Sequence, residues 1–179
     1  MGEKEIIAGC RNGDRKAQKA LTERYSPMLF TVARRYCSQD QDAADVLQDA
    51  LIRILKGLQK NYREEGKFER WLRTVVITTA LNALDKAKLK HEHPVDEIPF
   101  DAGAPPEAYA HLGAEALMKL IQALPDGYRE VFNLYVIEGC THREISAMLH
   151  ISEGTSRSQL MRARLMLQKM IMKNESIRL

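Results

Sequence analysis

The stretch PVDEIPFDAGAPPEAYAHL, residues 94–112, contains four of the six prolines in this 179-residue chain. Proline lacks the backbone N–H that a helix uses, and it pushes the residue before it out of helical geometry. A continuous helix therefore cannot pass through this stretch, and its residues do not alternate as those of a strand would. The sequence predicts an extended linker at 94–112 between one domain at 1–93 and a second domain at 113–179.

The charge changes at the same boundaries. Residues 94–112 carry four acidic residues and no Lys or Arg, whereas residues 1–93 have a net charge of +5 and residues 113–179 a net charge of +2. We interpret the linker either as a solvated spacer or as an acidic segment that lies in a basic channel meant for nucleic acid. The total charge of +3 does not by itself indicate nucleic acid.

Both flanking domains are predicted to be helical. In residues 42–60 the apolar residues recur at helical spacing, Asp42 is placed to cap the start, and Asp45 lies near the positive end of the helix dipole. Residues 67–90 carry a broad apolar face and a basic end. No alternating run of β-branched residues is bounded by turn signals. The expected fold class is all-α, with two small helical domains joined by an extended acidic linker.

The segment EGCTHREISAMLHISEGTSRSQLMRARL, residues 138–165, has helical spacing on both sides of a short break. Thr141 and Glu144 fit a capping box, T-x-x-E, at the start of the first helix. The break falls just before Ser152, which we expect to cap the second helix, while Ile151 fills the space between the two. Two short helices joined by a three-residue turn are the form of a helix-turn-helix.

The second of these helices has two different sides. An advance of about 100° per residue gives a core-facing stripe made of Ser156, Leu160, Ala163 and Leu167. The other side carries Ser158, Met161, Arg162 and Leu165, with Arg157 and Arg164 beside them. From residue 154 to residue 174 there are five Lys or Arg and no acid. A helical hairpin with a solvated charged surface is the alternative, but such surfaces usually mix both signs, so the pattern favours the major groove of DNA.

Other classes of protein are less well supported. Cys10, Cys37 and Cys140 lie far apart, without a C-x-x-C pair or a Cys/His cluster, so we interpret them as reduced thiols of a cytosolic protein. A redox-sensing thiol is the alternative. No apolar segment resembles a signal peptide or approaches the ~20 residues of a membrane span. We therefore expect a cytoplasmic protein without membrane insertion.

The motifs of enzymes are missing from the sequence. It has no metal-ligand spacing, no glycine-rich phosphate loop and no nucleophile motif. His91 and His93 are close together, but no Cys or third His stands near them. The sequence therefore predicts no catalytic residue, no metal and no cofactor.

Residues 124–167, LPDGYREVFNLYVIEGCTHREISAMLHISEGTSRSQLMRARLML, resemble the C-terminal domain of the extracytoplasmic-function (ECF) sigma factors of bacteria. The pattern of that family is, loosely, LP…R-x-V-F-x-L…E-G-x-(S/T)-x-x-E-I-A-x-x-L-x-I-S-x-G-T-V-x-S-x-L-x-R-A-x-x-x-L. Residues 42–56, DAADVLQDALIRILK, are similar to the family's helix that docks on the clamp of the largest polymerase subunit. Residues 66–88, GKFERWLRTVVITTALNALDKAK, are similar to its helix for the −10 promoter element. The resemblance covers nearly the whole chain.

This resemblance implies an initiation factor that binds core RNA polymerase and promoter DNA and catalyses nothing. It implies polymerase contacts at the beta flap and at the clamp, the latter through Asp45, Gln48 and Asp49. For the −10 element and the DNA backbone it implies Arg70, Trp71, Arg73, Thr78, Lys86 and Lys88. For the −35 element, in the major groove, it implies Thr155, Arg157, Ser158, Met161 and Arg162.

Several of these residues have a second interpretation. The three clamp residues also fit a solvated acidic surface, and Trp71 fits a core position as well as a base-stacking one. Bases extruded from the opened strand would then lie in a pocket formed by residues 61–67 and the start of the next helix. The acidic linker would thread a channel of the polymerase. The family also implies an anti-sigma protein as a partner, although the sequence itself does not identify one.

The chain departs from the family pattern at a few positions. The usual Asn, Asp and Arg of the −10 helix stand here as Thr78, Asn82 and Asp85, so an acid replaces a base beside DNA and weakens the local attraction to phosphate. Ser156 replaces an apolar residue on the core stripe, and its hydroxyl needs a partner. His150 replaces a common turn glycine.

A stand-alone helix-turn-helix regulator is the rival interpretation. It would bind a palindromic site as a dimer, and it leaves the similarity of the N-terminal domain without an explanation. For a sigma factor we expect a chain that is monomeric when free.

Overall fold

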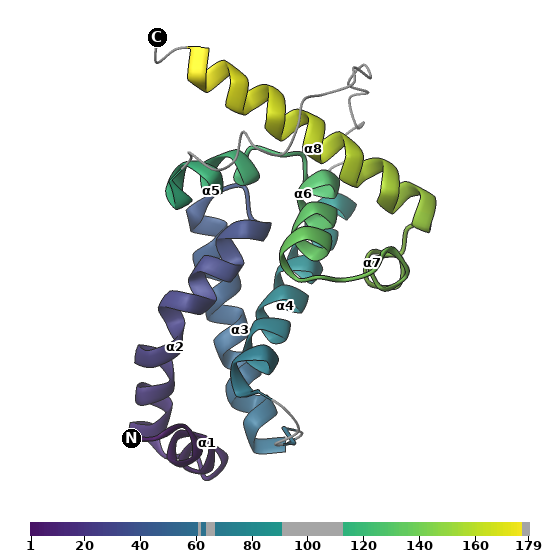
Figure 1. Cartoon of the computed structure of the whole chain (residues 1–179). Helices are drawn as coiled ribbons and strands as arrows, with labels where there is room; N and C mark the ends of the chain where they lie inside the picture. Colours follow the sequence, from purple (N-terminus) through teal and green to yellow (C-terminus); the bar gives the residue numbers. More distant parts are fainter. Residues whose placement is uncertain (61, 64–66, 91–112, 177–179) are drawn as a thin grey trace. The chain divides into compact units, whose positions relative to one another are not determined.

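The computed structural model describes residues 1–60, 62–63, 67–90 and 113–176, with side chains for all of these except 88–90 and 174–176. Throughout this part of the chain the regular secondary structure is helical, as an all-α fold requires (Figure 1). The chain divides into two compact units, Met1–Lys86 and Ala87–Leu179. The predicted linker, residues 94–112, lies outside the described residues.

The first unit is built from α1 (Glu3–Arg11), α2 (Arg15–Tyr36), α3 (Asp40–Lys60) and most of α4 (Phe68–Lys90). Helix α1 packs against both α2 and α3, and α2 packs along α3. The apolar residues that recur every three or four positions in these helices meet in one core. Its most deeply buried members include Ile6, Leu21, Leu29, Ile54, Leu58, Leu72 and Val76.

The start of α3 differs from the sequence prediction. The helix begins at Asp40, so Asp42 lies inside the first turn and is not the capping residue. The N–H of Ala43 donates to the carbonyl of Gln39, and Arg34 on α2 donates to Asp40 at 2.7 Å. The helix therefore starts earlier because α2 supplies a partner for its first residue. Asp42 still places negative charge where the helix dipole favours it.

An aromatic cluster closes the other end of the α3–α4 pair. Tyr25 of α2 meets Phe68 of α4 edge to face at 5.5 Å between ring centroids, and Trp71 lies 4.6 Å from Tyr62. Trp71 also covers Gly57 of α3, where a Cβ atom would come within 3.0 Å of the indole ring. Trp71 is thus a half-buried packing residue, as its core interpretation supposed.

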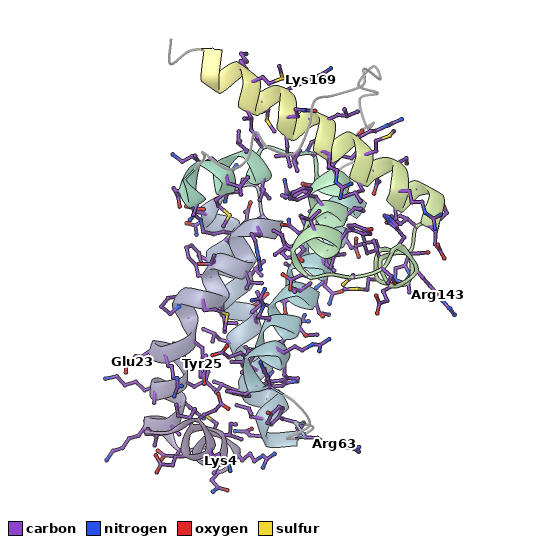
Figure 2. All side chains as sticks on the ribbon, viewed as in Figure 1. Lys4, Glu23, Tyr25, Arg63, Arg143 and Lys169 are labelled. Atoms are coloured by element: carbon purple, nitrogen blue, oxygen red, sulfur yellow. The ribbon has the colours of Figure 1, made fainter. Side chains whose placement is uncertain are left out.

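A polar contact ties α1 to this cluster. The Tyr25 hydroxyl donates to Glu3 at 3.0 Å, and the side chain of Tyr25 lies within the core (Figure 2). Burial, together with this hydrogen bond, raises the pKa of Tyr25 to about 12. The phenol therefore stays protonated across the physiological range and keeps its role as donor to α1.

The second unit contains α5 (Ala114–Gln122), α6 (Asp126–Phe132), a π-helical turn η2 (Asn133–Ile137), α7 (His142–Leu149) and α8 (Glu153–Ser176). Helices α5, α6 and α7 all pack against α8. Because α8 is the common partner, its apolar side is the centre of the core. The core includes Leu124, Tyr128, Val131, Leu134, Ile145, Leu160, Ala163, Leu167 and Ile171.

A buried arginine fixes the turn between α5 and α6. Arg129 is only 1% exposed, donates to the carbonyls of Leu124 at 2.6 Å and Gln122 at 3.2 Å, and pairs with Asp126. A buried charge is tolerated only when it is paired and hydrogen-bonded, so these partners hold Arg129 in one place. The amide of Asn133 donates to the Arg129 carbonyl at 2.9 Å and joins the turn to η2.

The part of the chain that the structure describes offers no helix that is both long and apolar enough to cross a membrane. The same residues contain no group of three or more His, Cys, Asp or Glu placed to hold a metal ion.

Two isoleucines of α3 test this packing. Ile54 is fully buried, whereas Ile52 is 46% exposed on the same helix. We expect Ile54→Ala to lower the free energy of unfolding by about 2–5 kcal/mol, because it leaves a cavity in the core. Ile52→Ala should change that free energy by no more than about 0.5 kcal/mol. Urea unfolding followed by circular dichroism measures both, and equal losses would contradict the assignment of the core.

Candidate nucleic-acid interface

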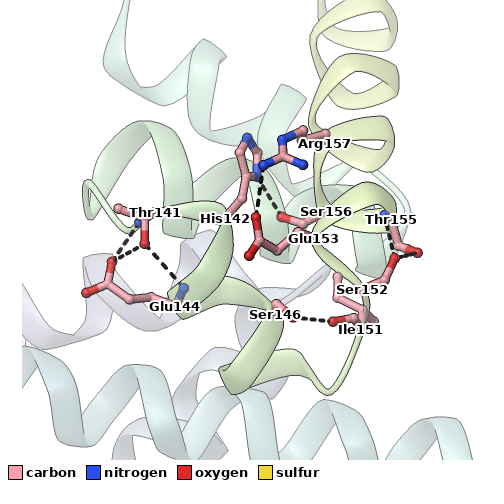
Figure 3. A network of polar contacts seen from close by, with 10 residues as sticks. All are labelled: Thr141, His142, Glu144, Ser146, Ile151, Ser152, Glu153, Thr155, Ser156 and Arg157. Carbon is pink, nitrogen blue, oxygen red and sulfur yellow. Dashed lines mark hydrogen bonds and ion pairs between the residues drawn. The ribbon is translucent and has the colours of Figure 1, made fainter.

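Helix α7 starts with the predicted capping box (Figure 3). The N–H of Glu144 donates to the hydroxyl of Thr141 at 3.3 Å, and the Glu144 carboxylate accepts from the Thr141 N–H at 2.7 Å and from its hydroxyl at 2.8 Å. These hydrogen bonds hold the pKa of Glu144 below its usual value. The carboxylate therefore stabilises the unit above the ordinary pKa of Glu, and this contribution is lost as the pH falls through the lowered pKa.

The turn between α7 and α8 is tight and is held by side chains. His150 adopts a left-handed conformation with φ 53° and ψ 39°, so it accepts the backbone strain that a glycine would avoid. The Ser146 hydroxyl donates to the carbonyl of Ile151 at 2.6 Å, and Ile151 is half-buried between the helices. Ser152 caps α8 as predicted, because its hydroxyl accepts from the N–H of Thr155 at 2.9 Å.

The two sides of α8 follow the predicted stripe closely. Ser156, Ala163 and Leu167 are fully buried and Leu160 is 5% exposed, so all four predicted core positions face inward. Among residues 155–164, the exposed side chains are those of Thr155, Arg157, Ser158, Met161 and Arg164. Figure 3 shows Thr155 and Arg157 at the first turn of the helix. The first three turns of α8 thus present hydroxyl, guanidinium and thioether groups on one continuous surface.

Arg162 does not lie as the helical wheel predicted. Its side chain is half-buried and its Nη1 donates to the hydroxyl of Tyr128 on α6 at 3.4 Å. Leu165, predicted on the same outer side, is half-buried as well. The expectation that this whole side of α8 is free of the core was therefore wrong. The physical reason is that α6 packs beside α8 and covers one edge of the surface that a single-helix projection leaves open.

The buried Ser156 has a partner that the sequence did not reveal. Its hydroxyl lies 2.9 Å from Nδ1 of His142 at the start of α7 (Figure 3). The ring of His142 stacks on Tyr135 at 4.5 Å between centroids, and the Arg164 guanidinium lies 5.9 Å from the centre of the Tyr135 ring. The contacts join the first and third turns of α8 to α7 and η2. A serine on an apolar stripe was the only sequence signal for this network.

A hollow of about 480 Å³ opens beside these residues. Its lining includes Tyr135, His142, Arg143 and Arg157, with Glu153 at the same rim. Glu153 accepts from Arg157 at 2.9 Å, one turn along α8. Because Arg143 and Arg157 are both exposed, the rim offers two cations from the two helices of the helix-turn-helix. Such a pair can bind the phosphates of a DNA strand.

Helix α4 carries a polar ladder on its outer side. Arg70, Thr74, Thr78 and Asn82 are exposed at successive four-residue steps. The hydroxyl of Thr78 donates to the Thr74 carbonyl at 2.8 Å, so the hydrogen of this hydroxyl is already bonded within the helix. Of the other predicted residues, Lys86 and Asp85 are exposed and Arg73 is half-buried, whereas the side chain of Lys88 lies outside the described residues. Trp71 is directed into the aromatic cluster and not onto this ladder.

Helix α3 presents the predicted acidic surface. Asp45, Gln48 and Asp49 are all exposed and follow one another around one side of the helix. Ile52 extends the same row and is 46% exposed, which the sequence analysis did not single out. An exposed apolar side chain at the end of an acidic row suits a protein partner better than a purely solvated surface. Of the predicted base pocket, only residues 62, 63 and 67 are described; residues 61 and 64–66 lie outside the described part.

Comparison with known families gives the class of protein that this geometry belongs to. "Sigma-70 region 2" matches residues 21–89, which covers most of α2 and all of α3, and "Sigma-70, region 4" matches residues 114–167, which includes α7, the turn and α8 as far as residue 167. Together the two matches cover more than half of the chain.

Individual relatives agree. The chain is 29% identical over 173 residues to the ECF RNA polymerase sigma factor SigE of Mycolicibacterium smegmatis, a match that covers 92% of this chain and 66% of that protein. It is 27% identical over 176 residues to the ECF RNA polymerase sigma-E factor of Escherichia coli K12, covering 92% and 91% respectively. Its fold is similar to that of the sigma factor RpoE of Bartonella quintana, solved in complex with the anti-sigma factor NepR, with a TM-score of 0.53, 22% identity and coverage of 87% and 96%.

The chain therefore belongs to the sigma-70 family of RNA polymerase sigma factors, as a member of its ECF group. Proteins of this class direct RNA polymerase to promoters, and they are transcription initiation factors and not enzymes. A stand-alone helix-turn-helix regulator does not account for the region 2 match, so that rival interpretation is set aside.

The His142–Ser156 contact can be tested by a double-mutant cycle. His142→Phe keeps an aromatic ring against Tyr135 but removes Nδ1, and Ser156→Ala removes the hydroxyl. We expect each single change to cost about 1 kcal/mol of unfolding free energy, because each leaves a partly buried polar atom unsatisfied. The double variant should cost less than the sum, with a coupling of about 0.5–1.5 kcal/mol. Strictly additive losses in urea unfolding would show that the contact does not stabilise the unit.

Proposed function

We propose that this ECF sigma factor divides its work between its two helical domains. The domain at 1–93 binds the clamp of core polymerase and the −10 element, and the domain at 113–179 recognises the −35 element. The observation that carries the proposal is the outer surface of α8, where exposed Arg157, Ser158 and Met161 lie beside one another on a helix whose opposite side is fully buried. Run-off transcription with core polymerase over a promoter library tests it directly.

The −35 element is read by the first turns of α8. Thr155, Arg157 and Ser158 lie near the N-terminus of α8. In helix-turn-helix proteins this end of the second helix enters the major groove. Arg157 can donate two hydrogen bonds to a guanine, and the apolar end of Met161 suits a thymine methyl group. Arg162 contacts DNA only if its guanidinium gives up the hydrogen bond to the Tyr128 hydroxyl, or donates to that hydroxyl and to DNA at the same time. Arg143, across the hollow, is placed for the phosphate backbone.

The −10 element is handled by the outer side of α4. Arg70, Arg73 and Lys86 supply positive charge for the backbone, and the hydroxyl of Thr78 and the amide of Asn82 supply neutral groups for bases. Asp85 repels phosphate at the end of this surface. We therefore expect a −10 sequence that differs from the one read by family members with a basic residue there. Trp71 contributes by holding α4 against α3 and not by stacking on a base.

Core polymerase is bound through the row Asp45, Gln48 and Asp49 on α3, with Ile52 as an apolar anchor at its end. Charged and polar groups around a single apolar side chain are the composition of a protein–protein interface. The second domain meets the beta flap. An anti-sigma protein, such as NepR in the RpoE complex, would act by covering these surfaces. The protein acts in the cytoplasm, and the chain is monomeric when it is not bound to polymerase.

Arg162→Ala tests the reading of the −35 element. We expect it to reduce the preference for the cognate −35 sequence by about 1–3 kcal/mol, the value of one good arginine–base contact. Tyr128→Phe is the matched control, because it removes only the hydroxyl that Arg162 contacts. Fluorescence anisotropy with cognate and scrambled −35 duplexes measures the preference, and thermal unfolding reports the fold. Equal loss in both variants would place the effect of Arg162 in packing and not in recognition.

The double variant Gln48→Ala, Asp49→Ala tests the polymerase surface. We expect its affinity for core polymerase to fall by about 1–2 kcal/mol, because two exposed polar contacts are lost at an interface. Glu23→Ala is the control, since it removes an exposed acid from α2 on the same unit (Figure 2). Surface plasmon resonance with immobilised core enzyme gives both affinities. If the two variants bind alike, α3 is not the contact surface.

A further inference from the structure

The first turn of α8 contains an ion pair between two of its own residues. Glu153 is the first residue of the helix, and its Oε2 accepts from Nη2 of Arg157 at 2.9 Å (Figure 3). The acid precedes the base by four residues, which is the favourable order for such a pair on a helix. The side chains of Glu153 and Arg157 are 43% and 61% exposed, so the pair contributes little to stability. Its consequence lies in where it holds the guanidinium.

The backbone that carries both residues is fixed. Ser152 caps the helix, and its carbonyl accepts from the N–H of Ser156 at 3.0 Å. The side chain of Ser156, directly before Arg157, is buried and lies 2.9 Å from the ring of His142. The negative charge of Glu153 also suits the positive end of the helix dipole. The long side chain of Arg157 is the part that can still turn, and Glu153 restricts it.

An exposed arginine at a DNA surface has two kinds of ligand. The edge of a guanine accepts two hydrogen bonds from one guanidinium and so identifies the base, whereas a phosphate carries no information about the sequence. A guanidinium has five N–H donors, so Nη2 of Arg157 can stay bonded to Glu153 while other donors contact a base. The carboxylate repels a phosphate that approaches the same guanidinium. Glu153 therefore favours a base over a phosphate as the ligand of Arg157.

The other charged groups beside the hollow have separate places. Arg143 lines the hollow from α7 and is exposed, so the rim carries two arginines against the one acid, Glu153. The carboxylate of Glu144 accepts from the N–H and the hydroxyl of Thr141 at the start of α7. Glu153, in contrast, lies on α8 itself, one turn before the arginine that it contacts. Its charge is therefore placed to act on Arg157.

We infer that Glu153 is a positioning residue for recognition of the −35 element, which holds the Arg157 guanidinium for a base edge and keeps it from the phosphates. The inference rests on the proposed role of α8 at the −35 element. Glu153 acts through Arg157 and does not itself read a base. The price in affinity is an acid at the DNA surface, and the gain is discrimination between base pairs.

The test uses the full-length chain bound to core polymerase. The probes are promoter duplexes with one base pair of the −35 element replaced, together with a duplex whose −35 element is scrambled. The comparison includes wild type, Glu153→Ala, Arg157→Ala and the double variant with both changes. Glu115→Ala is the control for charge, since Glu115 is an exposed acid on α5 of the same unit. Fluorescence anisotropy at several salt concentrations gives the affinities, and thermal unfolding reports the fold.

We expect Arg157→Ala to lose about tenfold of the discrimination at one base pair, which identifies the pair that Arg157 reads. Glu153→Ala should lose about threefold at the same base pair, within the range of coupling between residues in contact. Its affinity for the scrambled duplex should rise about twofold, with a salt slope steeper by about one, because the released guanidinium pairs with a phosphate. In the Arg157→Ala background, Glu153→Ala should change neither the discrimination nor the salt slope. Glu115→Ala should behave as wild type.

An equal loss of discrimination from Glu153→Ala with and without Arg157 would overturn the inference, because Glu153 would then act by itself. Unchanged or improved discrimination in Glu153→Ala would overturn it as well, since the carboxylate would then be idle or would compete with the base. The same changes in Glu115→Ala would reduce the effect to net charge. If Arg157→Ala kept full discrimination at every −35 position, the proposed function of this surface would fail first and the inference with it.

Discussion

Burial of one side of α8 is the constraint on which the second unit depends. Helices α5, α6 and α7 each pack against it, so the stripe from Ser156 to Leu167 fixes the rotation of α8 about its own axis. That rotation decides which residues point outward. Arg157, Ser158 and Met161 are exposed together because their neighbours on the other side have no freedom to turn. Recognition of DNA by such a helix is thus a consequence of core packing as much as of surface chemistry.

The first unit uses aromatic packing for a similar purpose. Trp71 packs over Gly57 of α3, and the ring of Tyr62 packs against both Trp71 and Phe68 of α4. These aromatic contacts fix the position of α4 relative to α3 at one end of the two helices. The helix proposed to meet polymerase and the helix proposed to meet the −10 element are therefore parts of one rigid packing arrangement. A polar side chain at position 71 would disturb the packing that supports both surfaces.

Local features were the most predictable from the sequence. The capping box of Thr141 and Glu144, the cap at Ser152 and the buried stripe of α8 all depend on residues within a few positions of one another, and all three are confirmed. The prediction was wrong where a second helix intervenes. Asp42 does not cap α3, because the helix begins earlier, at Asp40, which pairs with Arg34 of α2. Arg162 is half-buried because α6 lies beside it.

The sequence by itself determined the all-α class, the sigma-family pattern and the periodicity that divides each helix into an inner and an outer side, because these depend on residue type and spacing along one chain. Only the tertiary structure decided which edge of α8 stays open, that Ser156 meets His142, and that Arg11 of α1 donates a hydrogen bond to the carbonyl of Tyr62. These contacts join residues 14 or more positions apart. Their distances depend on how whole helices pack, and no local pattern in the sequence records that packing.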